Sequence, residues 1–152
     1  MSNVGFMTFL LGMVPIIELR GAIPFGVAGG LSVSVAILLA VLGNLLPIPF
    51  ILLFIRKIFS YMRSEKSNLG AIVDRMEKKV EKNRKVIDRY AWWGLVILVA
   101  IPLPGTGAWT GALVAAMLEM RIIRALPAIA LGVIIAAVIV SSLTFGIAGL
   151  FS

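Results

Sequence analysis

Three stretches of the chain contain no charged residue, and each is long enough to cross a membrane. They run from 21 to 55, from 90 to 118 and from 125 to 152. A spanning helix needs about 20 predominantly apolar residues. Two short motifs interrupt the apolar sequence, Glu18–Pro24 and Ile101–Gly107. The pattern therefore predicts membrane helices that are broken at two places.

The two breaks have similar surroundings. A Gly-x-x-x-Gly pair accompanies each of them, Gly26/Gly30 and Gly107/Gly111, and the two pairs are 81 residues apart. Such glycines allow close helix packing, or else contact with a substrate. Backbone that leaves the helix at membrane depth must be buried in protein or line a cavity. Because paired interrupted segments also mark the substrate site of many transporters, transport is the leading hypothesis.

The first half of the chain, residues 1–62, is predicted to contain a re-entrant helical hairpin at about 3–30 with its tip near Glu18–Pro24. A continuous helix through this cluster would contain an internal proline, at a cost of ~3 kcal/mol or more. A membrane-crossing helix at about 31–62 follows, bent where Pro47 and Pro49 each remove a backbone donor.

The second half, residues 90–152, repeats this plan. Its hairpin is expected at about 90–119 and its crossing helix at about 124–151. A cytoplasmic amphipathic helix at 63–89 joins the halves. The predicted fold is an all-α integral membrane protein in which two re-entrant hairpins and two crossing helices form an inverted repeat.

Composition and charge agree with a membrane protein. Of 152 residues, 61% are apolar and 14% charged, and the mean hydropathy is +1.08. Soluble domains carry about 25% charged residues. The net charge is +7, and the segment 56–89 holds eleven basic and five acidic residues. The positive-inside rule explains this cluster as a cytoplasmic segment, so no nucleic-acid partner is expected.

The arginines near the second crossing helix separate two topologies. Four simple spans would place Arg121 and Arg124 outside, whereas two hairpins with two crossings place both basic segments inside. The second topology obeys the positive-inside rule and is an inverted repeat. The first stays open as the alternative.

Several kinds of chemistry are unsupported. The chain contains neither cysteine nor histidine. Without cysteine, the chain can form no disulfide and has no thiolate chemistry. Without histidine, it has neither the usual proton carrier near neutral pH nor the commonest metal ligand. The sequence shows no paired carboxylates and no metal-ligand spacing, so we expect no enzyme activity, no cofactor and no metal.

The segment between the halves carries its own periodicity. Apolar residues and one asparagine form a heptad seam: Leu69, Val73, Met76, Val80, Asn83, Ile87 and Tyr90. This seam is typical of a subunit-docking helix, or of an amphipathic helix lying on the membrane or on its own protomer. The docking interpretation leaves a second function open, that of a non-transporting assembly or adaptor subunit.

Three motifs resemble those of the small multi-drug export protein family. They are Glu-Leu-Arg-Gly-Ala-Ile-Pro at 18–24, Gly-Asn-Leu-Leu-Pro-Ile-Pro-Phe at 43–50 and Ile-Pro-Leu-Pro-Gly-Thr-Gly-Ala-Trp-Thr-Gly at 101–111. The family is similar in plan to the DedA (VTT) superfamily, whose members pair re-entrant hairpins and are linked to flipping of polyprenyl-phosphate lipids. The resemblance implies a prokaryotic inner (plasma) membrane, contact with membrane lipid, and export or flipping of a small amphipathic or lipid-phosphate substrate.

Glu18 and Arg20 are the charged residues of the predicted hairpins. An ionisable side chain at membrane depth is costly and usually functional. Glu18 could bind a proton or a cationic substrate, or it could form a structural ion pair with Arg20. The predicted half-helix N-termini would instead favour an anion, with Arg20 adding charge and Thr106 capping the second arm.

The remaining candidate residues lie at the breaks and in the first crossing helix. Asn44 could hydrogen-bond the kinked backbone or a substrate, and Trp109 could stack on a substrate or simply pack. The predicted substrate- or ion-binding set is Glu18, Arg20, Pro24, Asn44, Pro102, Pro104, Gly105, Thr106, Gly107, Trp109 and Thr110. Two hairpins and two crossing helices can hardly shield the polar hairpin tips from lipid on all sides. We therefore expect a homo-oligomer, a dimer or larger.

Overall fold

The computed structural model describes residues 2–64, 74–75, 78 and 84–149, and throughout these ranges its regular structure is helical. The helices are α1 (Ser2–Met13), α2 (Glu18–Ala28), α3 (Val33–Leu45), α4 (Ile48–Ser64), α6 (Arg84–Ala100), α7 (Ala108–Met117) and α8 (Ile122–Gly149). The predicted all-α class is confirmed. Most of the predicted linker, with most of its heptad seam, lies outside the described residues and stays a prediction.

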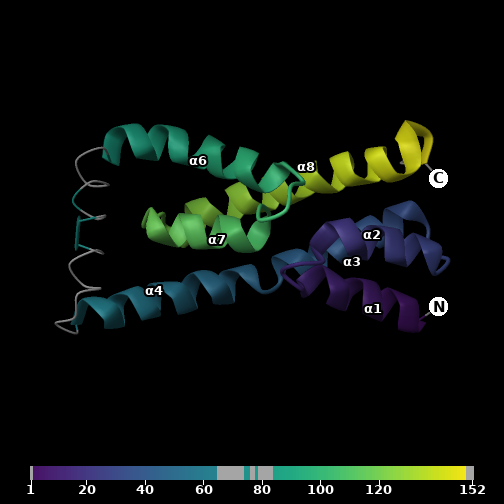
Figure 1. Ribbon diagram of the computed structural model, residues 1–152, viewed down its shortest axis with the longest axis horizontal. Coiled ribbons are helices and arrows are strands. Elements are labelled where there is room, and N and C mark those ends of the chain that lie inside the picture. The colour runs from purple at the N-terminus through teal and green to yellow at the C-terminus, as the bar shows by residue number, and fades with distance from the viewer. Residues whose placement is uncertain (1, 65–73, 76–77, 79–83, 150–152) are drawn as a thin grey trace.

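Two helical hairpins enter the molecule from opposite ends, and their tips meet near its middle (Figure 1). One hairpin is α1 with α2, and the other is α6 with α7. The pair α3–α4 and the single helix α8 each run nearly the full length of the molecule beside them. In both halves the first arm of the hairpin packs on the long helix that follows, α1 on α3 and α6 on α8.

The long helices match the predicted crossings. Within the described residues two helices are long and apolar enough to cross a membrane, Val33–Ile58 and Ile122–Gly146. The first spans α3 and α4, which are separated by a turn at Leu46 and Pro47. Pro47 has no N–H to donate, and this accounts for the predicted bend at that point.

The tip of the first hairpin lies earlier than predicted. The chain turns between Met13 and Glu18, and α2 then continues through Pro24 to Ala28. Pro24 therefore sits inside a helix, contrary to the expectation that it would mark the break. The helix tolerates the lost hydrogen bond because its buried face, including the fully buried Ala22 and Ile23, packs closely.

The turns that link the hairpins to the long helices share one geometry. The Leu31 N–H donates to Gly26 O at 3.0 Å, and the Met120 N–H donates to Ala115 O at 2.9 Å. Each turn contains a residue with positive φ, Gly30 at 95° and Glu119 at 54°. These equivalent positions are 89 residues apart in sequence.

The 81-residue correspondence of the glycine pairs is therefore wrong. Gly26 lies late in α2, whereas Gly107 precedes the first residue of α7. The two halves of the chain align through the turns that end α2 and α7. The loop of the second hairpin is longer than that of the first, so the two glycine pairs do not occupy equivalent positions.

Gly43 and Gly132 are 89 residues apart and occupy equivalent places. A Cβ on Gly43 would collide with Phe9 O of α1, and a Cβ on Gly132 would lie 2.9 Å from Val96 O of α6. Each long helix thus approaches the backbone of its hairpin's first arm, as small residues permit in membrane helix packing.

Replacing Gly43 by alanine should destabilise the protein, because the new methyl group would overlap a backbone oxygen. Overpacking of this kind costs about 1–3 kcal/mol. Thermal unfolding in detergent should show a lower midpoint for Gly43→Ala. Gly94→Ala is the matched control, since a Cβ on this α6 glycine meets nothing within 4 Å. Equal midpoints for the two variants would contradict the close approach.

Candidate functional site

Glu18 lies at the centre of the molecule, where the first hairpin turns into α2. It is the first residue of α2, has φ of 46° and is 5% exposed. Positive φ is uncommon for a residue other than glycine and marks a locally strained backbone. One carboxylate oxygen, Oε1, is buried without a hydrogen-bond partner among the described residues. Burying a carboxyl group with one oxygen unpaired lowers the stability of the fold, so the surrounding residues must stabilise it.

The N-terminus of α7 faces this carboxylate. The Trp109 backbone N–H is hydrogen-bonded to the Glu18 carboxyl group. Gly107 caps α7 with φ of 122°, and a Cβ at this position would collide with the Glu18 carboxylate oxygens. The first amides of a helix have no intrahelical partner and carry partial positive charge. The Glu18 carboxyl group of the first hairpin thus occupies the helix terminus of the second, a position that favours an anion.

Arg20 also contacts the opposite hairpin. Its guanidinium donates to Leu103 O, and to Thr106 O at 3.3 Å. Both carbonyls belong to the non-helical loop between α6 and α7, whose backbone groups must find partners within the protein. Glu18 and Arg20 are therefore not a simple ion pair that fixes one hairpin, because each side chain binds the other hairpin.

Thr106 does not cap α7, and this prediction is wrong. Its hydroxyl lies within hydrogen-bonding distance of Ile101 O and Leu103 O and accepts from the Leu103 N–H at 3.1 Å. The chain turns at Gly107, so the Thr106 side chain points back into its own loop. Gly107 is therefore the N-cap residue of α7. Thr110 Oγ1 donates to Gly105 O at 3.0 Å and braces the same loop.

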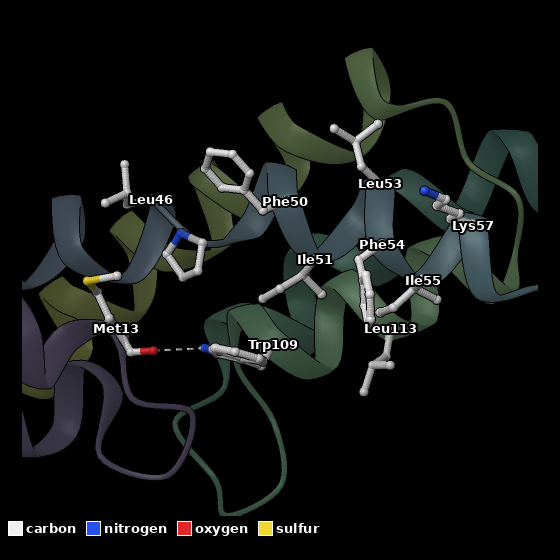
Figure 2. Close-up of a pocket in the computed structure, with 11 residues that line it drawn as sticks. Met13, Leu46, Phe50, Ile51, Leu53, Phe54, Ile55, Lys57, Trp109 and Leu113 are labelled. Carbon is white, nitrogen blue, oxygen red and sulfur yellow. Dashed lines mark hydrogen bonds between the residues drawn. The ribbon is translucent and has the colours of Figure 1, made fainter.

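Trp109 completes the contact between the tips. Its indole Nε1 donates to Met13 O at 3.2 Å, in the turn of the first hairpin, as Figure 2 shows. The tips are thus joined three times: by Glu18 at the α7 terminus, by Arg20 at the α6–α7 loop and by Trp109 at Met13.

A cavity of about 10 Å³ lies behind these contacts, close to the volume that one water molecule requires. Of the predicted site residues, five line it: Glu18, Arg20, Asn44, Pro102 and Gly107. Asn44 is 1% exposed, and its Oδ1 lacks a partner within the described residues. Two buried acceptor oxygens from different helices therefore share one small cavity. Pro24, Pro104 and Gly105 do not line it.

A larger hollow was missed by the sequence reasoning. An open groove of about 900 Å³ runs between α4 and α7 and ends at the tip of the first hairpin (Figure 2). It is lined by Met13, Leu46, Pro47, Phe50, Ile51, Leu53, Phe54, Ile55, Lys57, Trp109 and Leu113. The signal in the sequence was the run of large apolar residues from Phe50 to Ile55 along α4.

The family model described as "Putative small multi-drug export protein" matches residues 18–139. The chain belongs to this family. The match begins at Glu18, directly after the turn of the first hairpin, and includes the α6–α7 loop and most of both long helices. Membership and the two long apolar helices identify a membrane protein, and the family's description indicates a transporter rather than an enzyme. No curated protein and no solved structure matches the chain.

Arg20→Gln should loosen the junction of the tips, because two loop carbonyls would lose their charged donor. Leu103 is exposed, so its carbonyl can bind water, whereas the contact at Thr106 is partly buried, and a buried carbonyl without a partner costs about 1–3 kcal/mol. Thermal unfolding should show a clear loss of stability, and Arg20→Lys should restore only part of it, since lysine lacks the planar fork of donors.

Arg124→Gln is the control for this experiment, because Arg124 is exposed on α8. If Arg20→Gln were as stable as Arg124→Gln, the guanidinium would not be holding the loop.

Proposed function

We propose that this protein is a small proton-coupled membrane exporter of amphipathic molecules, with its proton site where two re-entrant hairpins meet. The family supplies the export function, and the geometry at Glu18 supplies the reason to expect coupling to protons. We place the protein in the prokaryotic inner membrane with its basic linker in the cytoplasm.

The lengths of the returning arms support the re-entrant arrangement. At 1.5 Å per residue, α2 with 11 residues and α7 with 10 residues are each about 15–17 Å long. This is half of the ~30 Å hydrocarbon core, so tips that enter from opposite sides meet near its midplane. The two non-helical loops then meet at the midplane, where the hydrogen bonds of Arg20 and Trp109 join them.

The 89-residue correspondence supports an inverted repeat. Equivalent turns and the equivalent close approaches of Gly43 and Gly132 recur in hairpins that point in opposite directions. In transporters built this way, one repeat rocks against the other around a fixed site. The hairpin tips and the small cavity at Glu18 would be the proton-binding part of that site.

The observation that carries the proposal is the Glu18 carboxyl group, buried at the tips with one oxygen unpartnered. Ionised, it binds the positive end of α7; protonated, it loses most of that attraction. That attraction is offset by the cost of burying a charge, so proton binding would change how strongly the two hairpins are linked. A ligand can shift a conformational equilibrium only through different affinity for the two states, and the proton has such a difference here.

A lipid phosphate bound at the tips has less support than a proton. Free α7 amides and Arg20 would be the natural donors to a phosphate. In the structure, Glu18 faces the α7 terminus and the loop carbonyls occupy Arg20. The chain itself therefore uses both donors, which favours a proton at the tips and a substrate bound elsewhere.

We also propose that the exporter is a homo-oligomer. The tips cover one another on their inner side, but the loop residues Leu103, Pro104 and Gly105 stay exposed. A second copy would shield this polar backbone from lipid.

Glu18→Gln should abolish pH-driven export, because the amide cannot take up or release a proton. The measurement is movement of an amphipathic anion and an amphipathic cation in proteoliposomes under an imposed pH gradient. Glu18→Asp should keep part of the activity. Glu119→Gln is the matched control, since Glu119 also has positive φ but lies exposed at the α7–α8 turn.

Full pH-driven export by Glu18→Gln would contradict proton coupling through this residue. Deleting residues 66–86 distinguishes an exporter from the alternative, a non-transporting assembly or adaptor subunit. That function requires the linker, whereas export through the hairpins should survive its removal.

A further inference from the structure

The groove between α4 and α7 is apolar along nearly its whole length. Its walls are aliphatic and aromatic side chains; Phe54 on α4 lies toward Leu113 of α7, whereas the Phe50 ring lies on the side of α4 away from α7. No acidic side chain is among its lining residues, and Lys57 is the charged member of the set. Lys57 lies at the end of the groove away from Met13 and Trp109 (Figure 2). Apolar walls with one basic end fit an amphiphile that has an anionic head.

The length of the groove fits one leaflet of a bilayer. From Leu46 to Lys57 the helix rises about 16 Å at 1.5 Å per residue. This is about half of the ~30 Å hydrocarbon core. The apolar end reaches the hairpin tips, and the basic end belongs to the segment that the positive-inside rule places in the cytoplasm. A molecule in the groove would therefore have its head at the cytoplasmic surface and its tail end at the tips.

Lys57 is available to such a head group. Its side chain is exposed, whereas the neighbouring Arg56 donates to Met120 O at the α7–α8 turn. Because Arg56 has this backbone partner, Lys57 is the cation placed to meet a ligand in the groove.

Trp109 connects the groove to Glu18. Its indole forms part of the groove wall and donates to Met13 O, another lining residue. Its backbone N–H is bound to the Glu18 carboxyl group. A tail that moves the indole away from Met13 would therefore act on the residue whose backbone amide holds the carboxylate. The groove and the carboxyl group are separate features joined through one residue.

We infer that this groove is the substrate site of the exporter and that it takes a single-chain amphiphile, with the tail against Trp109 and an anionic head at Lys57. This inference rests on the proposed export function and names its substrate class. The other occupants, an ordinary bilayer lipid or a cationic amphiphile, are outcomes that the following test separates.

The test uses Trp109 as a reporter in a variant carrying Trp92→Phe and Trp93→Phe, which leaves it as the single tryptophan. The protein is placed in nanodiscs of zwitterionic lipid. The probe is an alkyl phosphate brominated near the end of its chain, which quenches an indole on contact. It is compared with an alkyltrimethylammonium that has the same brominated chain, at equal concentration in the membrane.

The phosphate should quench Trp109 at about five-fold lower concentration than the ammonium, the scale of one exposed ion pair. Lys57→Gln should remove this difference, and Arg124→Gln, outside the groove, should preserve it. Leu113→Phe, which narrows the groove, should weaken quenching by both probes. Equal quenching by the two heads in the parent protein, or a preference unchanged in Lys57→Gln, would overturn the inference.

Failure of the groove and failure of the proposed function are distinguishable. If Glu18→Gln loses pH-driven export but Trp109 does not discriminate between the heads, the groove inference alone is wrong. If Trp109 discriminates and Glu18→Gln still exports normally, the proton coupling alone is wrong.

Discussion

The contact between the Glu18 carboxylate and the N-terminus of α7 is the interaction on which the rest of the structure depends. A carboxyl group at membrane depth needs a donor, and the first amides of a helix need an acceptor. Each hairpin brings one of these groups to the middle of the molecule, so neither tip is satisfied without the other. The absence of a side chain at Gly107 leaves the space that this contact occupies. Arg20 and Trp109 reinforce the junction with hydrogen bonds to the opposite tip.

A junction made this way can also act as a switch. Its strength depends on the charge of one side chain, whereas the packing of α1 on α3 and of α6 on α8 does not. Protonation would change the strength of the contact between the tips and leave each hairpin attached to its own long helix. In the proposed export function, these two units and the charge-dependent contact between them would provide alternating access. Because Trp109 lines the groove and also binds Glu18, a substrate in the groove would act on the same contact.

The sequence predicted the helical class, the two breaks and the bend at Pro47, because prolines, glycines and apolar length act locally. It located the first tip too late, since the Glu18–Pro24 cluster is polar and contains a proline yet forms helix where packing favours it. The capping role assigned to Thr106 was wrong because the direction of that side chain depends on the turn at Gly107. Glu18, Arg20 and Asn44 could be singled out as costly residues in apolar sequence. Their partners across the hairpins, and the groove along α4, depend on tertiary packing that no local pattern encodes.

The measurement that tests the central claim most directly is the side of the membrane from which Arg121 is reached. The chain contains no cysteine, so a single Arg121→Cys variant can be labelled in oriented vesicles with a membrane-impermeant maleimide. Asn3→Cys in a separate variant marks the opposite end of the molecule. Hairpins that enter from opposite sides place residue 121 in the cytoplasm and residue 3 outside. Labelling of residue 121 from the outside and of residue 3 from the cytoplasm would establish four simple spans and contradict the account.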